Sequence, residues 1–330
     1  MVMNNNEVIE LLKTKKSFHI VSHYNPDGDS IGSALALGTV LKYDDKHVEV
    51  FCLDPVPEKY TFLTNSSNVL NDLSEIDPSG VILVVLDCSD ISRTGLTEEH
   101  IDNYDLVINI DHHKTNEYFG DINLVVPEAS ATGEIIFEII KQGNLLLNFE
   151  IAQALYVAIS TDTGSFKFEN TTSHTHEVIA EIMKYDIKHS QIAQQVFEEK
   201  PLPYFFLLKN ALSSLEFWHG GKVSCITVSK ELLNQIGANL EMLDGIVNYA
   251  KNIDTVEIGI LFYIADKNEV KVGMRSKNVD ISIIAERFNG GGHARAAGFR
   301  AMKNYPDVKA TTIQAASELI DEYYNGNKKS

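Results

Sequence analysis

The sequence predicts an α/β fold: a parallel sheet flanked by helices, followed by a smaller α+β C-terminal domain. In the first half, short β-rich runs alternate with helical patterns, as in a parallel sheet covered by helices. Runs such as VILVVL and LVINI are apolar on both faces, which is typical of strands buried between two layers. At about 100–200 residues per domain, a chain of 330 residues is expected to form two domains.

The elements are assigned in chain order. Strands are predicted at 18–22, 48–53, 81–86, 106–110 and 122–126, and helices at 30–43, from about 131, at 151–160 and at 174–185. A helical pattern continues over 188–214, where Pro201 and Pro203 break or kink it. The later strands are predicted near 223–228, 256–264 and 270–275, and the later helices near 240–250, 282–288 and 311–324. We therefore place one domain at 1–187, a helical linker at 188–214 and a second domain at 215–330.

Composition narrows the classes of partner and location. With 28 basic and 46 acidic residues the formal charge is −18, which argues against a wide basic surface and hence against long duplex DNA as a partner. The longest aliphatic run, 81–86, is far short of the ~20 residues that span a bilayer, and the N-terminus lacks a signal-peptide pattern. Three cysteines without close spacing predict no disulfide framework. We expect a cytoplasmic protein without membrane contact.

Acidic and histidine side chains follow the predicted strands at the points where these end. Three groups come directly after the first, third and fourth strands, and a further acid follows the helix at 151–160; the residues are His23, Asp27, Asp29, Asp87, Asp111, His112, His113 and Asp162. The carboxyl ends of parallel strands meet at one edge of a sheet, where ligands bind. The first three groups are therefore expected to converge on one site.

So many acids at one site indicate bound metal ions. Like charges packed closely repel one another, and they stay ionised together only when cations are present. Mixed carboxylate and imidazole ligands suit Mn²⁺ or Fe²⁺ better than Ca²⁺, and a set without cysteine argues against structural zinc. Two ions about 3.5–4 Å apart would clamp the attacking and leaving oxygens of a phosphoryl transfer.

A competing motif lies in the same segment. The sequence GDSIG, residues 28–32, fits the G-x-S-x-G nucleophile elbow in a strand-turn-helix context, with Ser30 as the nucleophile of a serine hydrolase. Only one short strand precedes Ser30, whereas an α/β-hydrolase carries an oxyanion-hole loop upstream of its elbow. The alternative assignment of Ser30 is a residue in the first turn of a helix.

A basic, glycine-rich segment lies far along the chain. Residues 270–300 hold six Lys or Arg against two acids, a local charge of 6 − 2 = +4 in a chain of −18. Backbone N–H groups at Gly290, Gly291 and Gly292 can approach an anion closely, and the planar guanidinium of Arg275 can grip a phosphate. This segment is predicted to bind phosphate, with a solvated basic face as the alternative.

Together these motifs resemble the DHH phosphoesterases, which are named for the tripeptide seen here as Asp111-His112-His113. NPDGDSIGS, Asp87, IDHHKTN, STDTGSF and GGGHARAAG occur in the family's order, so that the resemblance covers almost the whole chain. The sequence looks most like the bacterial two-domain subgroup of nanoRNases with pAp phosphatase activity and cytoplasmic pApA phosphodiesterases. RecJ-type exonucleases share the motifs but carry further DNA-binding parts.

The resemblance implies a role for each matching residue. Two Mn²⁺ ions, with Mg²⁺ or Co²⁺ as alternatives, would be bound by His23 and Asp27 at one position and by Asp29, His112 and Asp162 at the other, with Asp87 as the bridging ligand. Asp111 would orient His112, and His113 would contact the phosphate. Across a catalytic cleft between the domains, substrate would be bound by Arg275, Ser276, Gly290, Gly291, Gly292, His293 and Arg295. A homodimer is a further implication.

The leading hypothesis is a manganese-dependent phosphoesterase that cleaves short oligoribonucleotides, linear dinucleotides such as pApA, or pAp to mononucleotides by two-metal hydroxide attack. Cyclic dinucleotide turnover belongs to the same range of substrates, and neither the physiological substrate nor the cleavage polarity follows from the sequence. The alternatives are a serine hydrolase acting through Ser30 and a non-catalytic nucleotide-binding regulator.

Overall fold

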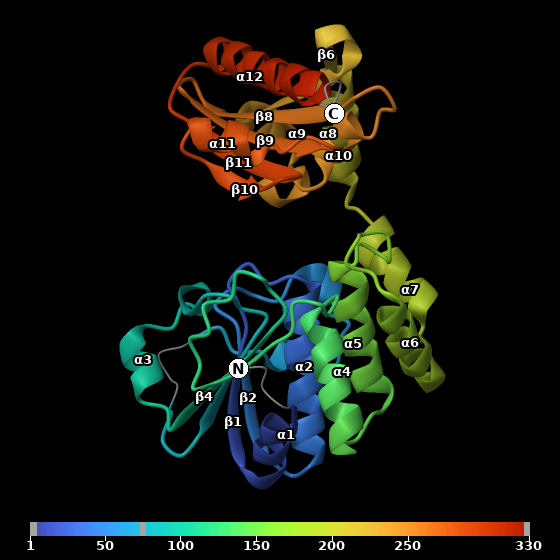
Figure 1. Cartoon of the computed structure of the whole chain (residues 1–330). Helices are drawn as coiled ribbons and strands as arrows, with labels where there is room; N and C mark the ends of the chain where they lie inside the picture. Colours follow the sequence, from blue (N-terminus) through green and yellow to red (C-terminus); the bar gives the residue numbers. More distant parts are fainter. Residues whose placement is uncertain (1–4, 73–76, 327–330) are drawn as a thin grey trace. The chain divides into compact units, whose positions relative to one another are not determined.

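A parallel sheet forms the centre of the first part of the chain (Figure 1). In the computed structural model, which describes residues 5–72 and 77–326, this sheet has five strands in the order β2-β1-β3-β4-β5. All neighbouring pairs are parallel, and the strands are β1 (Ser17–Val21), β2 (His47–Phe51), β3 (Ile82–Leu86), β4 (Leu106–Asp111) and β5 (Ile122–Val125). The predicted α/β fold is confirmed.

The strand order places a topological switch point between β1 and β3. From β1 the chain passes through α2 (Gly28–Tyr43) to β2 at one edge, whereas β3 is followed by β4 and β5 towards the other edge. The connections that leave β1 and β3 therefore diverge, and open α/β sheets bind ligands in the crevice at such a point. His23 and Asp87 stand in these two connections, close behind their strands.

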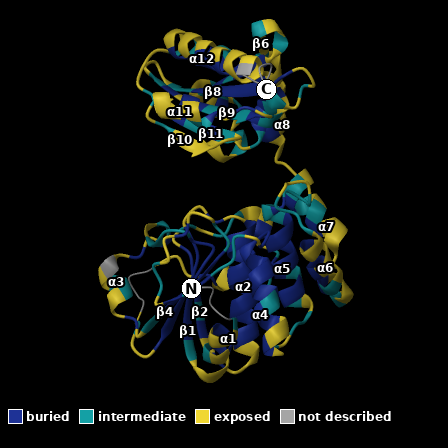
Figure 2. Ribbon diagram, viewed as in Figure 1, coloured by how far each residue is buried: buried dark blue, intermediate teal, exposed yellow. Residues whose placement is uncertain are grey.

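Helices cover one face of this sheet in two layers. Helix α2 packs on the sheet with α4 (Thr132–Gly143), α1 (Asn5–Thr14) packs against α4, and α5 (Phe149–Asp162) packs on α2 and α4. Both α2 and α5 are largely buried (Figure 2). The two helices approach closely at Gly32, where a Cβ would lie 2.5 Å from the carbonyl oxygen of Ala154.

The opposite face of the sheet has a smaller cover. Alternate residues of β3 serve the two sides, because side chains along a strand point to opposite faces. Val84 belongs to the core beneath α2 and α4, whereas Leu83 and Val85 pack with Leu96 and Tyr104. The segments that cover this second face are the 3-10 turn η3 (Ile91–Thr94) and α3 (Glu98–Asp102).

The chain divides into two units at residues 199 and 200. The first unit also contains η1 (Glu58–Tyr60), η2 (Ser66–Asn68), α6 (Ser173–Ile182), η4 (Met183–Tyr185), α7 (His189–Ala193) and the π-helical turn η5 (Gln194–Glu198). The segment 188–214 spans this division, since α8 (Leu202–Ser213) lies in the second unit. Pro201 is the N-cap of α8 with a further Pro in its first turn, where the missing N–H groups cost nothing.

The second unit is built on a mixed sheet. Among the described residues it has six strands in the order β10-β11-β9-β8-β7-β6, with β7 and β8 parallel and the other pairs antiparallel. The strands are β6 (Glu216–Trp218), β7 (Val223–Ser229), β8 (Ile258–Asp266), β9 (Glu269–Ser276), β10 (Gly291–His293) and β11 (Ala296–Ala301). The helical segments are η6 (His219–Gly221), α9 (Lys230–Ile236), η7 (Leu240–Leu243), α10 (Ile246–Lys251), α11 (Ser282–Arg287) and α12 (Tyr305–Gly326).

Two details of this unit differ from the prediction. The expected helix at 240–250 is interrupted, because Gly245 has φ +80° and a right-handed helix cannot continue through that conformation. The hairpin of β10 and β11 was not predicted, since its glycines and alanines show neither β-branched residues nor alternation. No helix in the described ranges combines the length and the apolar character that a membrane span requires.

Candidate metal centre

The acids and histidines predicted at the strand ends lie together. Among the described residues, three groups have ligand atoms within 4.8 Å of one another and could each hold a metal ion. Asp87 belongs to two of these groups, and His112 also belongs to two. The groups are His23, Asp27 and Asp87; Asp29, His112 and Asp162; and Asp87, His112 and His113.

The first group is organised around His23. Its Nε2 lies 3.9 Å from Oδ1 of Asp27 and 3.6 Å from Oδ2 of Asp87. Its Nδ1 lies 2.7 Å from the backbone oxygen of Tyr24, and because a carbonyl only accepts hydrogen bonds, Nδ1 must donate. The Nε2 lone pair of the neutral ring therefore faces the carboxylates, as in a metal-ligating histidine. Asp27 also caps α2 by accepting from the backbone N–H of Ser30.

The second group is organised in the same way around His112. Its Nε2 lies 3.8 Å from Oδ2 of Asp29 and 3.6 Å from Oδ2 of Asp162. Its Nδ1 lies 3.3 Å from the backbone oxygen of Ala129, which again fixes the ring with Nε2 towards the acids. Asp162 is the last residue of α5, and Asn170 donates to its Oδ2 at 3.2 Å.

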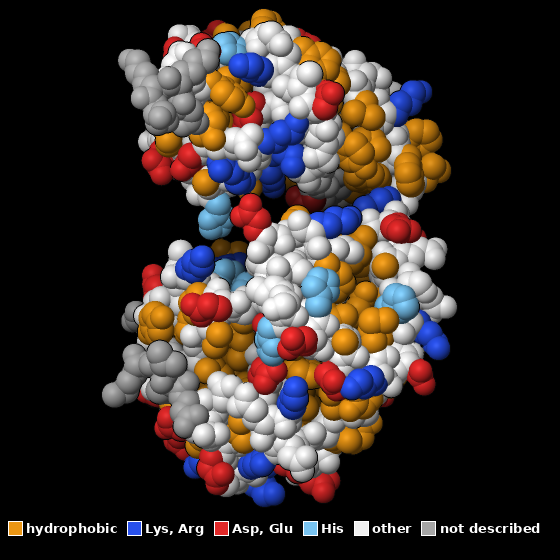
Figure 3. Space-filling view, turned by 45° about the vertical axis from the view of Figure 1, so that its right-hand side comes forward, with side chains coloured by type: hydrophobic (Ala, Val, Ile, Leu, Met, Phe, Trp, Pro, Cys, Tyr) orange, Lys and Arg blue, Asp and Glu red, His pale blue; other side chains and the backbone are white. Residues whose placement is uncertain are grey.

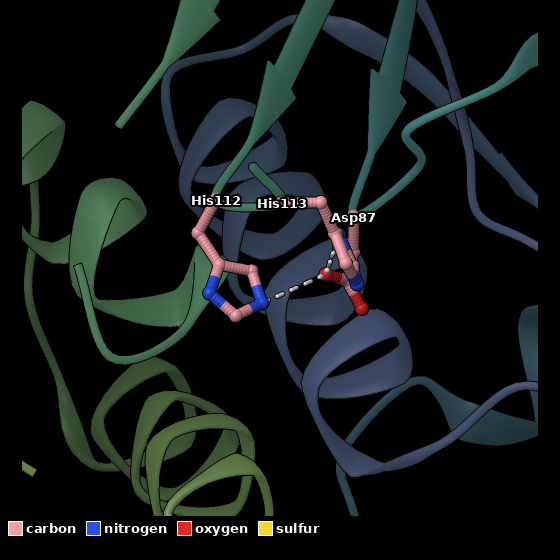
Figure 4. Close-up of side chains that lie close together, drawn as sticks. All are labelled: Asp87, His112 and His113. Carbon is pink, nitrogen blue, oxygen red and sulfur yellow. Dashed lines mark ion pairs between the residues drawn. The ribbon is translucent and has the colours of Figure 1, made fainter. Parts of the chain in front are cut away.

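Asp87 lies between the two groups. Its Oδ2 faces His23 at 3.6 Å, and its Oδ1 faces Nε2 of His112 at 3.7 Å and Nδ1 of His113 at 3.8 Å. Figure 4 shows the two imidazole rings that follow β4 directed at this carboxylate. The residue has φ +57°, a conformation rare for a non-glycine residue, and its side chain is buried. One oxygen of Asp87 is thus available to each group.

The carboxylates at this site are strongly perturbed. Burial, reinforced by the charge of Asp87, raises the pKa of Asp27 and raises that of Asp29 well above its usual range. Burial also raises the pKa of Asp162 to about 6. Burial acts to raise the pKa of Asp87 as well, but its three histidine neighbours outweigh that effect and lower it. Cations would let all four acids ionise together, and the oxygen and imidazole donors suit divalent ions.

Residues that sequence reasoning missed hold these acids in place. The first residues of α4 bind Asp29: the backbone N–H groups of Thr132 and Gly133 donate to its two oxygens at 2.7 and 2.9 Å. The hydroxyl of Thr132 also donates to Oδ1 of Asp87 at 3.0 Å. A Cβ at Gly133 would lie 2.6 Å from that of Ala158, so only glycine allows this approach. The one sequence signal was their position at the start of a predicted helix.

The structure corrects the expected role of Asp111. Its Oδ1 accepts from Nδ1 of His113 at 2.7 Å and from the backbone N–H of His112 at 2.8 Å, whereas the imidazole of His112 turns to Ala129. The alternation of side chains along an extended chain explains this, since residues 111 and 113 fall on the same side. Asn116 donates to the other oxygen of Asp111 at 2.6 Å. The hydrogen bond with Asp111 raises the pKa of His113 to about 9.

Ser30 lies in the first turn of α2 and is fully buried. Its hydroxyl donates to the backbone oxygen of Asp27, and its own N–H is bound by the side chain of Asp27. A nucleophile elbow requires an exposed serine oxygen at the top of the sheet. The geometry therefore favours the helix-turn assignment of Ser30 over the serine hydrolase.

The predicted phosphate-binding residues of the second unit lie around the β10–β11 hairpin. Arg275 on β9 is paired with Ala296, and the exposed residues His293 and Arg295 lie at the turn between β10 and β11. Ser276 differs from the expectation, because it is buried and its hydroxyl donates to the backbone oxygen of Val279 at 2.6 Å. In the space-filling view, Lys and Arg side chains gather on the visible face of this unit (Figure 3).

The three glycines have different roles in this hairpin. A Cβ at Gly290 would collide with the carbonyl oxygen of Gly298, and Gly292 has φ +140°, a conformation that favours glycine. The position of the Cβ at Gly291 is open. Two of the glycines are therefore required by the fold of the hairpin, and Gly291 leaves its backbone accessible.

The sequence matches two family models. Residues 17–159 match the N-terminal domain of the DHH family, and residues 222–325 match the DHHA1 domain. The bifunctional oligoribonuclease and PAP phosphatase NrnA of Thermus thermophilus is 34% identical over 298 residues, with 88% of this chain and 86% of that protein covered. The protein of the same name from Bacillus subtilis is 26% identical, with 88% and 91% covered.

The solved structures include a chain with the same fold. The crystal structure of an exopolyphosphatase-related protein from Bacteroides fragilis superposes with a TM-score of 0.87, at 24% identity and with 96% of this chain and 97% of that chain covered. The matched models include the segments that carry the histidines, all but one of the acids described above, and the β10–β11 hairpin. The chain belongs to the DHH family of phosphoesterases.

Proposed function

We propose that this protein is a manganese-dependent phosphoesterase that hydrolyses short oligoribonucleotides, linear dinucleotides such as pApA, and pAp to mononucleotides. The observation that carries the proposal is the pair of histidine-carboxylate groups that share Asp87. The names of the Thermus and Bacillus relatives, an oligoribonuclease and PAP phosphatase, support this range of substrates.

In this proposal two Mn²⁺ ions are the cofactors. His23 and Asp27 hold one ion, Asp29, His112 and Asp162 hold the other, and Asp87 bridges them. Mixed imidazole and carboxylate donors favour Mn²⁺, and Mg²⁺ or Co²⁺ can occupy such ligands. When bound, a pair of divalent ions activates water as the nucleophile and neutralises charge on the phosphoryl oxygens.

His113 is proposed to stabilise the phosphoryl group. Its Nδ1 is bound by the buried carboxylate of Asp111, which keeps the ring protonated at neutral pH. The Nε2–H is then left to donate to a phosphoryl oxygen, and the side chain is 36% exposed and so within reach of a substrate. A charge-assisted hydrogen bond of this kind is strongest when charge develops on the oxygen, that is, in the transition state. Asp111 is a positioning residue for His113.

The basic hairpin of the second unit is proposed to bind another phosphate of the substrate. Arg275, His293 and Arg295 supply cationic or hydrogen-bonding side chains there, and Gly291 leaves its backbone accessible. Burial lowers the pKa of Arg275, but a guanidinium still remains charged at neutral pH. The role of Ser276 is limited to the turn at residues 276–279, which its hydroxyl stabilises.

The experiment that tests this function is a side-by-side measurement of hydrolysis of pAp, pApA, a cyclic dinucleotide and RNA of two to five residues. We expect turnover on pAp or on a linear substrate in Mn²⁺, and loss of turnover in chelator. Saturable binding without turnover would identify a nucleotide-binding regulator instead. Turnover that survives chelation would favour a hydrolase acting through Ser30.

A further inference from the structure

A pocket of about 200 Å³ lies beside the candidate metal centre in the first unit. Two of its lining residues, Asp27 and Asp162, are proposed metal ligands, and the remaining ones have no role in the function proposed above. These remaining residues are aromatic, aliphatic, cationic and hydroxylic: Lys59, Tyr60, Thr161, Val196 and Phe197.

Two short turns from distant parts of the chain build the far wall of this pocket. The 3-10 turn η1 contacts the π-helical turn η5, which contains Val196 and Phe197. Single π-helical turns are rare and are found frequently at functional sites. Val196 is buried in the core, whereas Phe197 is only partly buried. The irregular turn thus leaves the ring of Phe197 available to a ligand.

Tyr60 forms a fixed part of the wall. It is 2% exposed, and its hydroxyl interacts with the backbone amide of Gly28 at the start of α2. The ammonium group of Lys59 lies 4.9 Å from the centre of the Tyr60 ring. Since Tyr60 is packed in place, Phe197 is the aromatic side chain of the pocket that can stack on a ligand.

The position of the pocket connects it with both metal groups. Asp27 belongs to the group of His23, and Asp162 belongs to the group of His112. A phosphate held by both groups therefore has its organic substituent next to this pocket. At 200 Å³ the pocket is smaller than the roughly 300–1,000 Å³ typical of drug-sized ligands, so it accommodates one ring system rather than a whole dinucleotide.

We propose that this pocket is the base subsite for the nucleotide whose phosphate is hydrolysed, and that Phe197 stacks on the base. The inference rests on the proposed function, because it takes the phosphate to lie at the metal centre. Stacking on an aromatic ring tolerates any base, since every base has a π face. The pocket then selects nucleotides over other phosphoesters without selecting adenine over other bases.

The test compares pAp with its base-free analogue, 1-deoxyribose 3′,5′-bisphosphate, in Mn²⁺. Phe197→Ala is expected to lower kcat/KM on pAp by about 5- to 150-fold, the range measured when a stacking side chain is removed, and to leave the rate on the base-free analogue unchanged. Phe197→Tyr, which keeps the ring, is expected to retain most of the activity on pAp. Phe149→Ala, at a half-exposed phenylalanine of α5 outside the site, is the matched control and is expected to behave as wild type.

A binding measurement separates this inference from the proposed function. We expect wild-type protein to quench the fluorescence of 2-aminopurine riboside 3′,5′-bisphosphate, and Phe197→Ala to abolish the quenching. Quenching without hydrolysis of pAp by the wild type would leave the base subsite standing while the phosphoesterase fails. Equal losses on pAp and on the base-free analogue, or no quenching by the wild type, would overturn the base subsite.

Discussion

Asp111 holds His113: the Oδ1 of the buried carboxylate accepts a hydrogen bond from the ring Nδ1 at 2.7 Å. The second histidine of the tripeptide is therefore fixed in orientation and protonated, with its Nε2 free to donate. The first histidine, His112, is oriented by the backbone oxygen of Ala129 and directs its Nε2 to the acids. Adjacent histidines thus present opposite chemistry, one a hydrogen-bond donor and the other a metal ligand.

The pairing predicts non-additive effects. His113→Ala is expected to lower kcat/KM by about 10- to 150-fold, the value of a charge-assisted hydrogen bond of roughly 1.5–3 kcal/mol, while Mn²⁺ affinity is retained. Asp111→Asn keeps the shape but removes the charge, so it acts through His113. The double variant should therefore be no slower than His113→Ala alone. Losses that simply multiply would show that Asp111 does not act through His113.

Thr132 is predicted to position the bridging acid. Thr132→Val removes the hydroxyl that donates to Asp87 and keeps the backbone N–H that binds Asp29. Loss of such an outer partner weakens metal affinity by about 10- to 100-fold, which calorimetric titration with Mn²⁺ would measure. Thr132→Ser should restore the affinity. Thr312→Val, at a buried threonine of the second unit, is the control; unchanged affinity in Thr132→Val would remove the hydroxyl from the metal centre.

Substrate length should limit the rate. A chain of net charge −18 repels phosphates that extend beyond the site, within a Debye length of about 8 Å at physiological salt. We expect kcat/KM to fall at least about tenfold from a dinucleotide to a strand of ten residues, with added salt narrowing the difference by screening. Measurements on 5′-phosphorylated RNAs of two to ten residues at low and high salt would check this. Efficiency that is constant or rises with length would indicate a processive exonuclease.

His19 should make stability sensitive to acid. It is buried in β1, its Nδ1 lies 2.7 Å from the Tyr104 hydroxyl, and burial lowers its pKa below 6.5, an effect that Glu49 only partly offsets. Below pH 6.5 the unfolded state then binds more protons than the folded state. Neutral His19 therefore stabilises the fold fully above that pH and progressively less below it, by at most about 1.4 kcal/mol per pH unit.

Denaturant unfolding between pH 7.5 and 5 would measure this contribution. The free energy of unfolding of His19→Gln is expected to fall less steeply with decreasing pH than that of the wild type. His189→Gln, at an exposed histidine of α7, should follow the wild type. Parallel curves for wild type and His19→Gln would show that another group causes the acid sensitivity.

The sheet and the positions of its acids could be predicted because they depend on local pattern and one topological rule. Runs such as 81–86 are apolar at every position, so their ends are visible in the sequence, and Asp87 follows at once. The rule that parallel strands end at one edge then brings distant acids together. The same reasoning could not assign Asp111 to His113, since the hydrogen bond depends on how the chain leaves β4.

The residues that could not be predicted depend on packing between distant segments. Thr132 and Gly133 reach Asp29 only because α4 packs against α2, about 100 residues earlier in the chain. Phe197 lines its pocket through a π-helical turn, which has no sequence signature. Ser276 seemed suited to phosphate, but it adjoins Arg275 on a strand, where neighbouring side chains face opposite ways, and it is buried.

Asp87 carries the central claim, because it is the ligand that both groups share. Asp87→Ala is expected to lower kcat by at least about 10³-fold, since ions that lose their common ligand no longer supply several kcal/mol of charge stabilisation. Ser30→Ala should keep a readily measurable rate. Reversed sensitivities would overturn the assignment of the metal centre.

The most direct measurement is the amount of metal at which activity returns. Protein stripped with chelator is titrated with Mn²⁺ while hydrolysis of pAp or pApA is followed and bound metal is counted. The account predicts no activity in the stripped protein and activity that saturates at about two ions per chain, as in two-metal sites. Activity that survives the stripping, or that saturates at one ion per chain and is indifferent to Asp87→Ala, would contradict it.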